Sequence, residues 1–455
     1  MASAIPLALR EEIERSSGGV IVDERARGGG GASRQGAEVT LRTPDERERR
    51  CYLAWDSRAG DPARRPYFER ETAILSALSG PLGDSGVRVA PLIAAAPSHL
   101  ALLSAFIPGE DRFAAAGDRA ALARDFVAQL AALHRVDAHH PSLATLGDPE
   151  APASAAIRTR LARLKSENLA RAPDPLLQLA LAWLADNVPE DRGPVVVVHG
   201  DAGPGNFLHD ENRVVAVVDW ELTHLGDPME DLAQIWVRSL IQPFVPMHEV
   251  FDAYEAAGGA TVDVNRVKYH RLYFQLGFSV GGHAALFSPD APPVASVGTS
   301  MMYNTMHKRV IVMSLAELTG VDLVTPDLAD APADWTDRMY GAAIDDLRNE
   351  ISPATSSQRA SAKVKDLARL VKFWRMRARY GAAWDGAEVR EIRARFPDAP
   401  DDLLGARAVF AQAVADGCIG RDEALQLCHN RMVRETALMA DAMGALAKTR
   451  YEALA

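Results

Sequence analysis

The chain has 455 residues, and its 50 lysines and arginines against 61 aspartates and glutamates give a net charge of −11 at pH 7. At about 150 residues per domain, this length predicts two or three domains and excludes a single small module. Nucleic acids and anionic membranes are polyanions that repel an acidic chain, so we expect neither of them as a partner.

Cysteine content and hydropathy bear on the compartment. The three cysteines, Cys51, Cys418 and Cys428, form no Cys-x-x-Cys pair, so neither a disulfide framework nor a zinc site is indicated. The first residues lack the basic segment of a secretory signal, and no run of about 18 apolar residues occurs. We therefore expect a cytoplasmic protein without a transmembrane helix.

Strand-like patterns dominate the beginning of the chain, and helical patterns dominate the rest. Short apolar runs between turn-forming residues extend over about 18–108 and enclose one predicted helix at 67–78. Helical spacing prevails over 118–323, interrupted by two β-rich runs at 195–198 and 214–218. The chain should therefore contain a small β-rich part followed by a larger α-rich part.

A segment rich in Pro, Asp and Ala, residues 325–334, predicts a linker, and almost everything after it is helical in pattern. The expected fold class is α+β, with an all-α domain at the C-terminal end. The predicted domains are 1–107, 108–325 and 335–455.

The strongest chemical signal is the loop His199–Asn206, which follows the apolar run 195–198. Its glycines and proline cannot sustain a helix, so the loop must turn sharply and bring Asp201 and Asn206 into one space. Asp219 follows an all-apolar strand. Oxygen ligands from Asn206 and Asp219 suit a Mg²⁺ ion that holds nucleotide phosphates. Asp201 is then placed to accept a proton from an attacking hydroxyl.

Two segments, His199–Phe207 and Val218–Ala233, resemble the aminoglycoside phosphotransferase-like family, which also includes choline kinase-like proteins. The resemblance covers about residues 18–325 and implies a bilobal, protein-kinase-like fold with a small β-rich nucleotide-binding lobe. It implies that Asp201 is the catalytic base and that Asn206 and Asp219 bind magnesium. The purely structural alternative is that His199–Asp201 form an ordinary turn and that Asp219 is a helix N-cap. It does not account for the order in which the loop, the strand and the second motif occur.

The same resemblance gives roles to residues before residue 110. The segment Gly28–Gly31 lies between two strand candidates, where glycine lets backbone N–H groups approach phosphates closely. We expect Gly30, Gly31 and Ser33 to contact the phosphates, although a simple hairpin connection would have the same composition. Ser104 and Phe106 resemble the hinge whose backbone holds the nucleotide base.

One expected basic residue is missing. Helical spacing aligns Glu71 with the apolar stripe of its helix, and a carboxylate there needs a partner. In the family this glutamate pairs with a basic residue on the preceding strand, which touches the phosphates. Here the strand 51–56 carries no Lys or Arg near Ala54 or Trp55. We predict that Arg58 supplies the charge; the alternatives are Arg42 and Arg50.

The predicted function is that of a Mg²⁺-dependent small-molecule kinase that transfers the γ-phosphoryl group of ATP or GTP to a hydroxyl. The resemblance admits a hydroxyacyl-CoA, a sugar, an amino alcohol or an aminoglycoside as acceptor. The alternative, motivated by the missing basic residue, is a catalytically impaired nucleotide-binding or interaction protein of the same fold. The sequence leaves open whether the C-terminal helices form a homodimer.

Overall fold

The computed structural model describes residues 5–27, 34–169 and 171–454, which fall into two compact units. The first, here called the sheet unit, runs to Ala153 and includes Asp191–Asp263; the second, the helical unit, contains Ser154–Glu190 and Val264–Ala455. Among the described helices, none has both the length and the apolar character needed to cross a bilayer.

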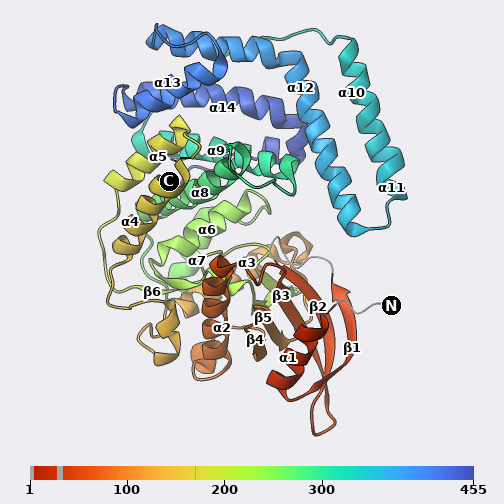
Figure 1. Cartoon of the computed structure of the whole chain (residues 1–455). Helices are drawn as coiled ribbons and strands as arrows, with labels where there is room; N and C mark the ends of the chain where they lie inside the picture. Colours follow the sequence, from red (N-terminus) through yellow and green to blue (C-terminus); the bar gives the residue numbers. More distant parts are fainter. Residues whose placement is uncertain (1–4, 28–33, 170, 455) are drawn as a thin grey trace. The chain divides into compact units, whose positions relative to one another are not determined.

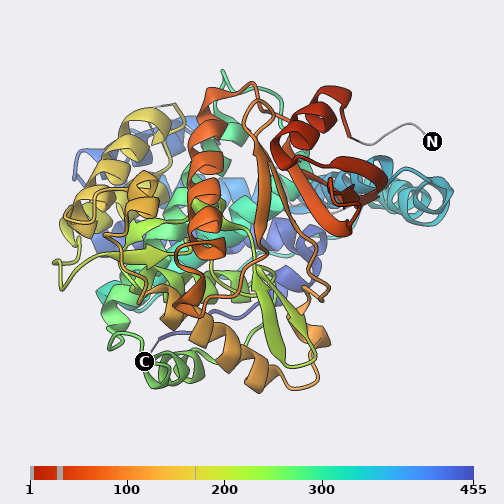
Figure 2. The same cartoon turned by 90° about the horizontal axis from the view of Figure 1, so that it is seen from below.

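The sheet unit is built around a five-stranded antiparallel sheet with the strand order β1-β2-β3-β5-β4 (Figure 1). Its strands are β1 (Val20–Arg27), β2 (Arg34–Arg42), β3 (Glu48–Asp56), β4 (Leu92–Ala96) and β5 (Ala101–Ala105). Side chains alternate between the two faces of a sheet. One face, with Val39 and Leu53, packs against Leu9 and Ile13 of α1 (Leu7–Ser17). Both faces are therefore occupied, because the other one carries side chains that meet α2 (Arg65–Ser79), seen beside the sheet in Figure 2.

The rest of the sheet unit consists of two small antiparallel sheets and several helices. The pairs are β6 (Val196–Val198) with β9 (His224–Gly226), and β7 (Phe207–Asp210) with β8 (Arg213–Val217). The helices are α3 (Arg119–Leu133), α6 (Met229–Ser239) and α7 (Met247–Ala256), with short 3-10 turns at Pro62–Arg64 (η1), Gly83–Ser85 (η2), Phe113–Ala115 (η3), Pro141–Leu146 (η4) and Trp220–Leu222 (η6). The two β-rich runs expected within the α-rich part are thus present as β6 and β8.

The described residues of the helical unit form only helices and their connections. Its main elements are α4 (Ala153–Arg163), α5 (Pro175–Asp186), α8 (Val264–Phe287), α9 (Val297–Thr319), α10 (Trp335–Asp345), α12 (Gln358–Arg395), α13 (Leu403–Ala415) and α14 (Arg421–Met443). Shorter pieces are the π-helical turns η5 (Leu164–Leu169) and η7 (Asp346–Ile351), the turn α11 (Ser352–Ala354) and the 3-10 turn η8 (Gly444–Lys448).

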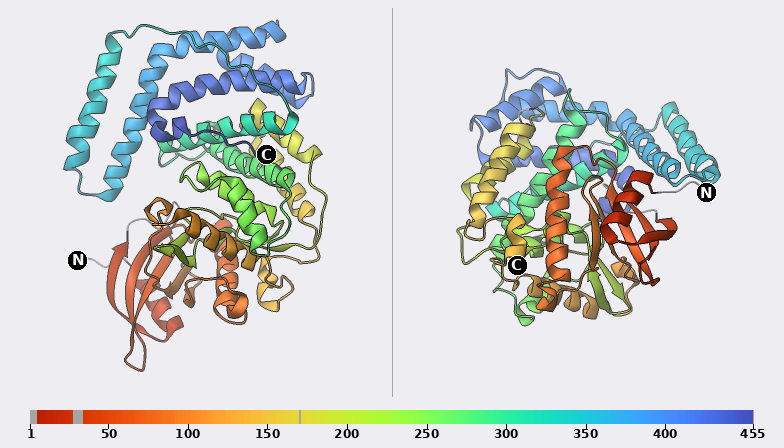
Figure 3. Two further views of the ribbon diagram at one scale, coloured as in Figure 1. Left: turned by 180° about the vertical axis from the view of Figure 1, so that it is seen from behind. Right: turned by 60° about the horizontal axis from the view of Figure 1, so that its bottom comes forward.

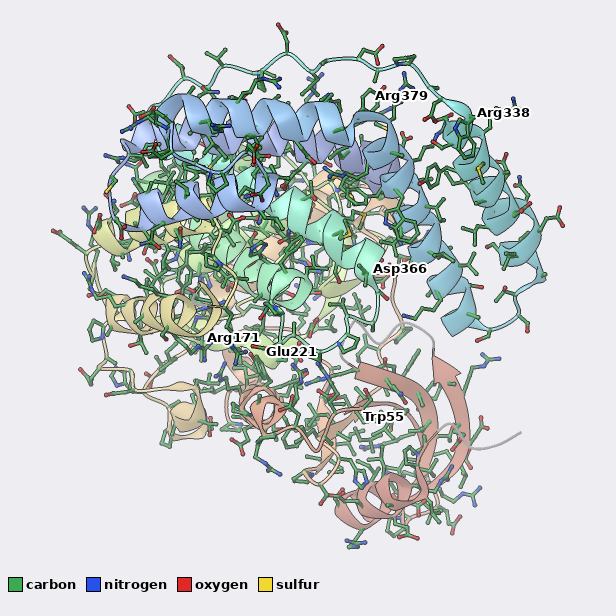
Figure 4. The ribbon with its side chains drawn as sticks, turned by 45° about the horizontal axis from the view of Figure 1, so that its top comes forward. Trp55, Arg171, Glu221, Arg338, Asp366 and Arg379 are labelled. Atoms are coloured by element: carbon green, nitrogen blue, oxygen red, sulfur yellow. The ribbon has the colours of Figure 1, made fainter. Side chains whose placement is uncertain are left out.

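Helix α12 joins two layers of the helical unit. Its first half lies beside α10 (Figure 3), where Ile344 and Val371 share an apolar cluster and Arg375 forms two hydrogen bonds of 2.7 Å with Asp337. On another side of α12, the carboxylate of Asp366, labelled in Figure 4, accepts hydrogen bonds from the backbone N–H and the hydroxyl of Thr299 on α9, at 2.7 and 2.8 Å.

Buried charges tie the C-terminal helices to the earlier ones. Asp174, which caps α5, is 1% exposed and lies 2.7 Å from Lys308 Nζ on α9 and 3.2 Å from Arg431 Nη1 on α14. Arg431 also contacts Glu435 at 2.7 Å. Opposite charges removed from water must be paired. The helices after residue 335 therefore belong to the same core as α5 and α9, which differs from the separate C-terminal domain expected from the sequence.

Candidate functional site

The loop between β6 and β7 turns as sharply as its glycines and proline predict. Gly200 has φ 81°, and a Cβ atom there would lie 2.3 Å from the carbonyl oxygen of Leu222. Only glycine tolerates both the left-handed conformation and this close approach. The loop can therefore lie directly against the turn η6, which follows Asp219.

Asp231 at the start of α6 holds this loop in place. Its fully buried carboxylate accepts hydrogen bonds from the backbone N–H groups of His199 and Gly200, at 2.8 and 2.9 Å. It also lies 3.0 Å from Nε2 of His134, whose Nδ1 contacts the hydroxyl of Tyr254 at 2.6 Å. Burial alone would raise the pKa of Asp231, but these partners hold it below its usual value, so the anchor stays ionised.

The structure brings together Asp201 and Asn206, two of the residues singled out in the sequence. The Asn206 amide donates to the Asp201 carboxylate at 2.8 Å. Arg238 on α6 joins both: Nη1 donates to Asp201 at 2.7 Å, and Nη2 donates to Oδ1 of Asn206 at 2.9 Å. Its Nε donates to the backbone carbonyl of Pro204 at 3.0 Å. Sequence reasoning missed Arg238, because α6 follows 23 residues after the loop ends and nothing local links the two.

Asp219 lies between β8 and η6 in a conformation that is unusual for a residue with a side chain. Its φ and ψ are 67° and 60°, a strained region in which non-glycine residues are uncommon. Two hydrogen bonds hold the preceding residue, Val218: its N–H donates to the Asn206 carbonyl at 3.0 Å, and His199 Nε2 lies 3.0 Å from its carbonyl oxygen. Asp219 is therefore connected through Val218 to the loop that carries Asp201.

The electrostatics of these residues fit a divalent cation. Burial raises the pKa of Asp219, and the negative charge of Asp201 raises it further. A bound cation would relieve the repulsion that Asp201 exerts on an ionised Asp219, and oxygen donors are those that Mg²⁺ prefers. Within the described part of the chain, no three His, Cys, Asp or Glu side chains gather as a metal site.

Glu71 has a basic partner, but not the predicted one. Its carboxylate is 5% exposed and forms an ion pair with Arg34 at the start of β2. Arg58 does not pair with Glu71 as predicted: its side chain is 55% exposed, with Nε 3.7 Å from Asp56, and a contact with a nucleotide stays a prediction. Both alternatives are paired elsewhere, Arg42 with Glu48 and Arg50 with Glu38. Burial raises the pKa of Glu71 to about 7, against the opposing effect of Arg34.

The expected hinge follows β5. Ser104 pairs with Tyr52 of β3 in the sheet, and the N–H of Phe106 donates to the Arg50 carbonyl at 3.1 Å. The Phe106 ring lies 4.2 Å from the Arg50 guanidinium. The structure thus fixes this segment at the end of the sheet, while a role in holding a nucleotide base stays a prediction. Gly30, Gly31 and Ser33 lie outside the described residues.

Comparison with known proteins identifies relatives of part of the chain. The family described as "Phosphotransferase enzyme family" matches residues 33–267, a little over half of the chain. Acyl-CoA dehydrogenase family member 11 of Rattus norvegicus is 32% identical over 130 residues, which is 27% of this chain and 16% of that protein. Its counterpart in Homo sapiens is 37% identical over 75 residues, 16% of this chain and 10% of that protein. The chain thus matches less than a fifth of these relatives' length.

Two solved structures that match part of the chain are named as macrolide phosphotransferases. Macrolide 2'-phosphotransferase MphH from Brachybacterium faecium has 23% sequence identity and a TM-score of 0.45, and the similarity covers 63% of this chain and 98% of that one. Macrolide 2'-phosphotransferase type I has 20% identity and a TM-score of 0.47, over 66% of this chain and 97% of that one.

Proposed function

The chain belongs to the phosphotransferase enzyme family, and from this premise we propose that it is a Mg²⁺-dependent kinase of small molecules. In this proposal it transfers the γ-phosphoryl group of ATP or GTP to a hydroxyl. The observation that carries the proposal is the cluster of Asp201, Asn206 and Asp219, with the first two held by one guanidinium. The loop that carries Asp201 and Asn206 shares hydrogen bonds with Val218, the residue before Asp219.

Each side chain of the cluster has a task in such a transfer. Asp201 accepts the proton of the acceptor hydroxyl and orients that oxygen toward the phosphorus. Asn206 and Asp219 hold the cation, which neutralises negative charge on the phosphates when bound. Arg238 keeps Asp201 and Asn206 in a fixed geometry, so little reorganisation is needed when the substrates bind.

The first test is thermal unfolding with Mg²⁺ plus ATP or GTP, because a ligand that binds only the folded state raises the unfolding midpoint. We expect a Mg²⁺-dependent rise in the wild type that is lost in Asp219→Ala. The matched control is Asp210→Ala, an exposed aspartate at the end of β7, which should keep the rise. A rise that does not need Mg²⁺, or that survives in Asp219→Ala, would contradict the proposal.

The acceptor is proposed from the names of the relatives. Because the matched segments belong to proteins named as acyl-CoA dehydrogenases, we propose a hydroxyacyl-CoA as the first acceptor to test. Sugars, amino alcohols, aminoglycosides and macrolides form the comparison panel. Transfer of label from γ-labelled nucleotide to one class of acceptor identifies it. Nucleotide binding without transfer to any of them would favour the impaired nucleotide-binding protein instead.

A further inference from the structure

The guanidinium of Arg34 lies in an acidic environment at the end of β2 that follows the Gly-rich segment. Its side chain is 12% exposed, forms an ion pair with Glu71 and lies 3.6 Å from the Glu221 carboxylate. Burial acts to lower the pKa of Arg34, but the neighbouring carboxylates, Asp219 among them, raise it above its usual value. Arg34 is therefore a fixed positive charge close to the proposed metal ligand.

One donor of this buried guanidinium is unused. The Nε atom of Arg34 has no hydrogen-bond partner within the described ranges. A buried donor without a partner destabilises the fold, and a bound acceptor group would recover that cost. Phosphate oxygens are strong acceptors and match the planar fork of arginine.

The pairing of β2 with β3 shows which positions share a sheet face with Arg34. Arg34 pairs with Asp56, and the next position on the same face of β3 is Ala54. Trp55, labelled in Figure 4, points to the opposite face and is 5% exposed in the core with α1. Ala54 and Trp55 are the two β3 positions at which the expected basic residue is missing. Only Ala54 therefore faces the same side of the sheet as Arg34.

A second arginine, Arg64, forms ion pairs with two of the acidic side chains near Arg34. Arg64 contacts Asp56 at 2.5 Å and Glu221 at 3.2 Å. Glu221, labelled in Figure 4, is thus shared between two guanidinium groups. With Asp56 and much of Glu221 balanced by Arg64, Arg34 has Glu71 as its close ionic partner and an N–H group left for a ligand.

We propose that Arg34 binds the nucleotide phosphates from β2, while Glu71 holds the guanidinium in position. The missing basic residue of β3 is thereby replaced from the neighbouring strand. This inference rests on the proposed kinase function. It adds a specific ligand contact for a residue that lies outside the loop His199–Asn206 and outside β3. It also removes the reason for expecting an impaired site.

The test compares binding of ATP, ADP and adenosine to the full chain by calorimetry in the presence of Mg²⁺. The loss of one charge-assisted hydrogen bond from Nε predicts that Arg34→Ala weakens binding of ATP and ADP by roughly 10- to 100-fold. Adenosine has no phosphate, so its affinity should stay the same and also report that the variant is folded. The double variant Arg34→Ala/Ala54→Lys should recover most of the affinity for ATP, since it restores a cation on the same face.

The controls separate this inference from the function on which it rests. Arg65→Ala removes an arginine whose side chain is 53% exposed, and it should bind ATP like the wild type. If Arg34→Ala does not fold, Arg34→Gln/Glu71→Gln leaves no unpaired buried carboxylate and takes its place. If the wild type binds ATP and Arg34→Ala does not weaken this binding, or Arg58→Ala weakens it instead, the proposed role of Arg34 is overturned and the proposed kinase function is not. A wild type that binds no nucleotide overturns both proposals.

Discussion

The fork of Arg238 gives the sharpest test of how the site is held together. The guanidinium makes hydrogen bonds of 2.7 Å to Asp201, 2.9 Å to Asn206 and 3.0 Å to the Pro204 carbonyl. The side chains of Arg238 and Asp201 are 24% and 19% exposed, so solvent screens these bonds in part. At about 1 kcal/mol for each bond, Arg238→Met should lower the free energy of unfolding by about 3 kcal/mol.

A lysine separates charge from geometry at the same position. Arg238→Lys keeps one positive charge for Asp201 but cannot reach Asn206 and Pro204 at the same time, so it should lose about 2 kcal/mol. Because the two side chains then lose their common support, phosphoryl transfer should slow by roughly 10²-fold even in the folded variant. Substrate affinity should change much less than turnover.

Urea unfolding followed by tryptophan fluorescence measures the change in stability, since Trp220 and Trp236 are buried on the elements around the loop. Arg192→Met is the matched control: its side chain is 69% exposed in a surface pair with Asp263, and stability should hardly change. An Arg238→Met protein that unfolds within about 0.5 kcal/mol of the wild type would refute the reasoning.

Two predictions concern the buried charges of the helical unit. Lys308→Met leaves the buried carboxylate of Asp174 with fewer cations, and should lower the free energy of unfolding by roughly 3–5 kcal/mol in urea titrations, whereas Arg395→Met, in an exposed pair, should hardly change it. Acid should also destabilise the helical unit. Although burial acts in the opposite direction, the cations around Asp174 and Glu435 hold both pKa values low, that of Glu435 at about 2. A lowered folded-state pKa stabilises the fold above about pH 4 and loses this effect as pH falls toward 2. Urea midpoints from pH 7 to pH 3 should fall accordingly, and a flat profile would contradict the assignment.

Local sequence patterns were enough to find one helix and two strands, because these elements depend mainly on residues that are neighbours along the chain. The helix at 67–78 lies within α2, and both β-rich runs are strands. The proximity of Asp201 and Asn206 also followed from the sequence, because the four residues of a Gly- and Pro-rich loop between them cannot separate them far. Their catalytic and metal-binding roles stay predictions.

Contacts between distant segments could not be found in this way. Whether a basic residue meets Glu71 depends on the pairing of β2 with β3 and on where α2 lies. The three arginines considered from the sequence lie near other carboxylates: Arg42 near Glu48, Arg50 near Glu38 and Arg58 near Asp56. The linker at 325–334 has the composition of a domain boundary. Composition does not reveal that Arg431 on one side of it neutralises Asp174 on the other.

The sequence by itself determined the α+β class, the family and the loop that carries Asp201 and Asn206, since each is encoded in residues close together along the chain. Only the tertiary structure decided which cations balance the buried or half-buried carboxylates: Arg34 for Glu71, Arg238 for Asp201, and Lys308 for Asp174. The physical reason is that the energy of a charge away from water depends on its neighbours in space. Those neighbours come from strands and helices that the chain order does not place side by side.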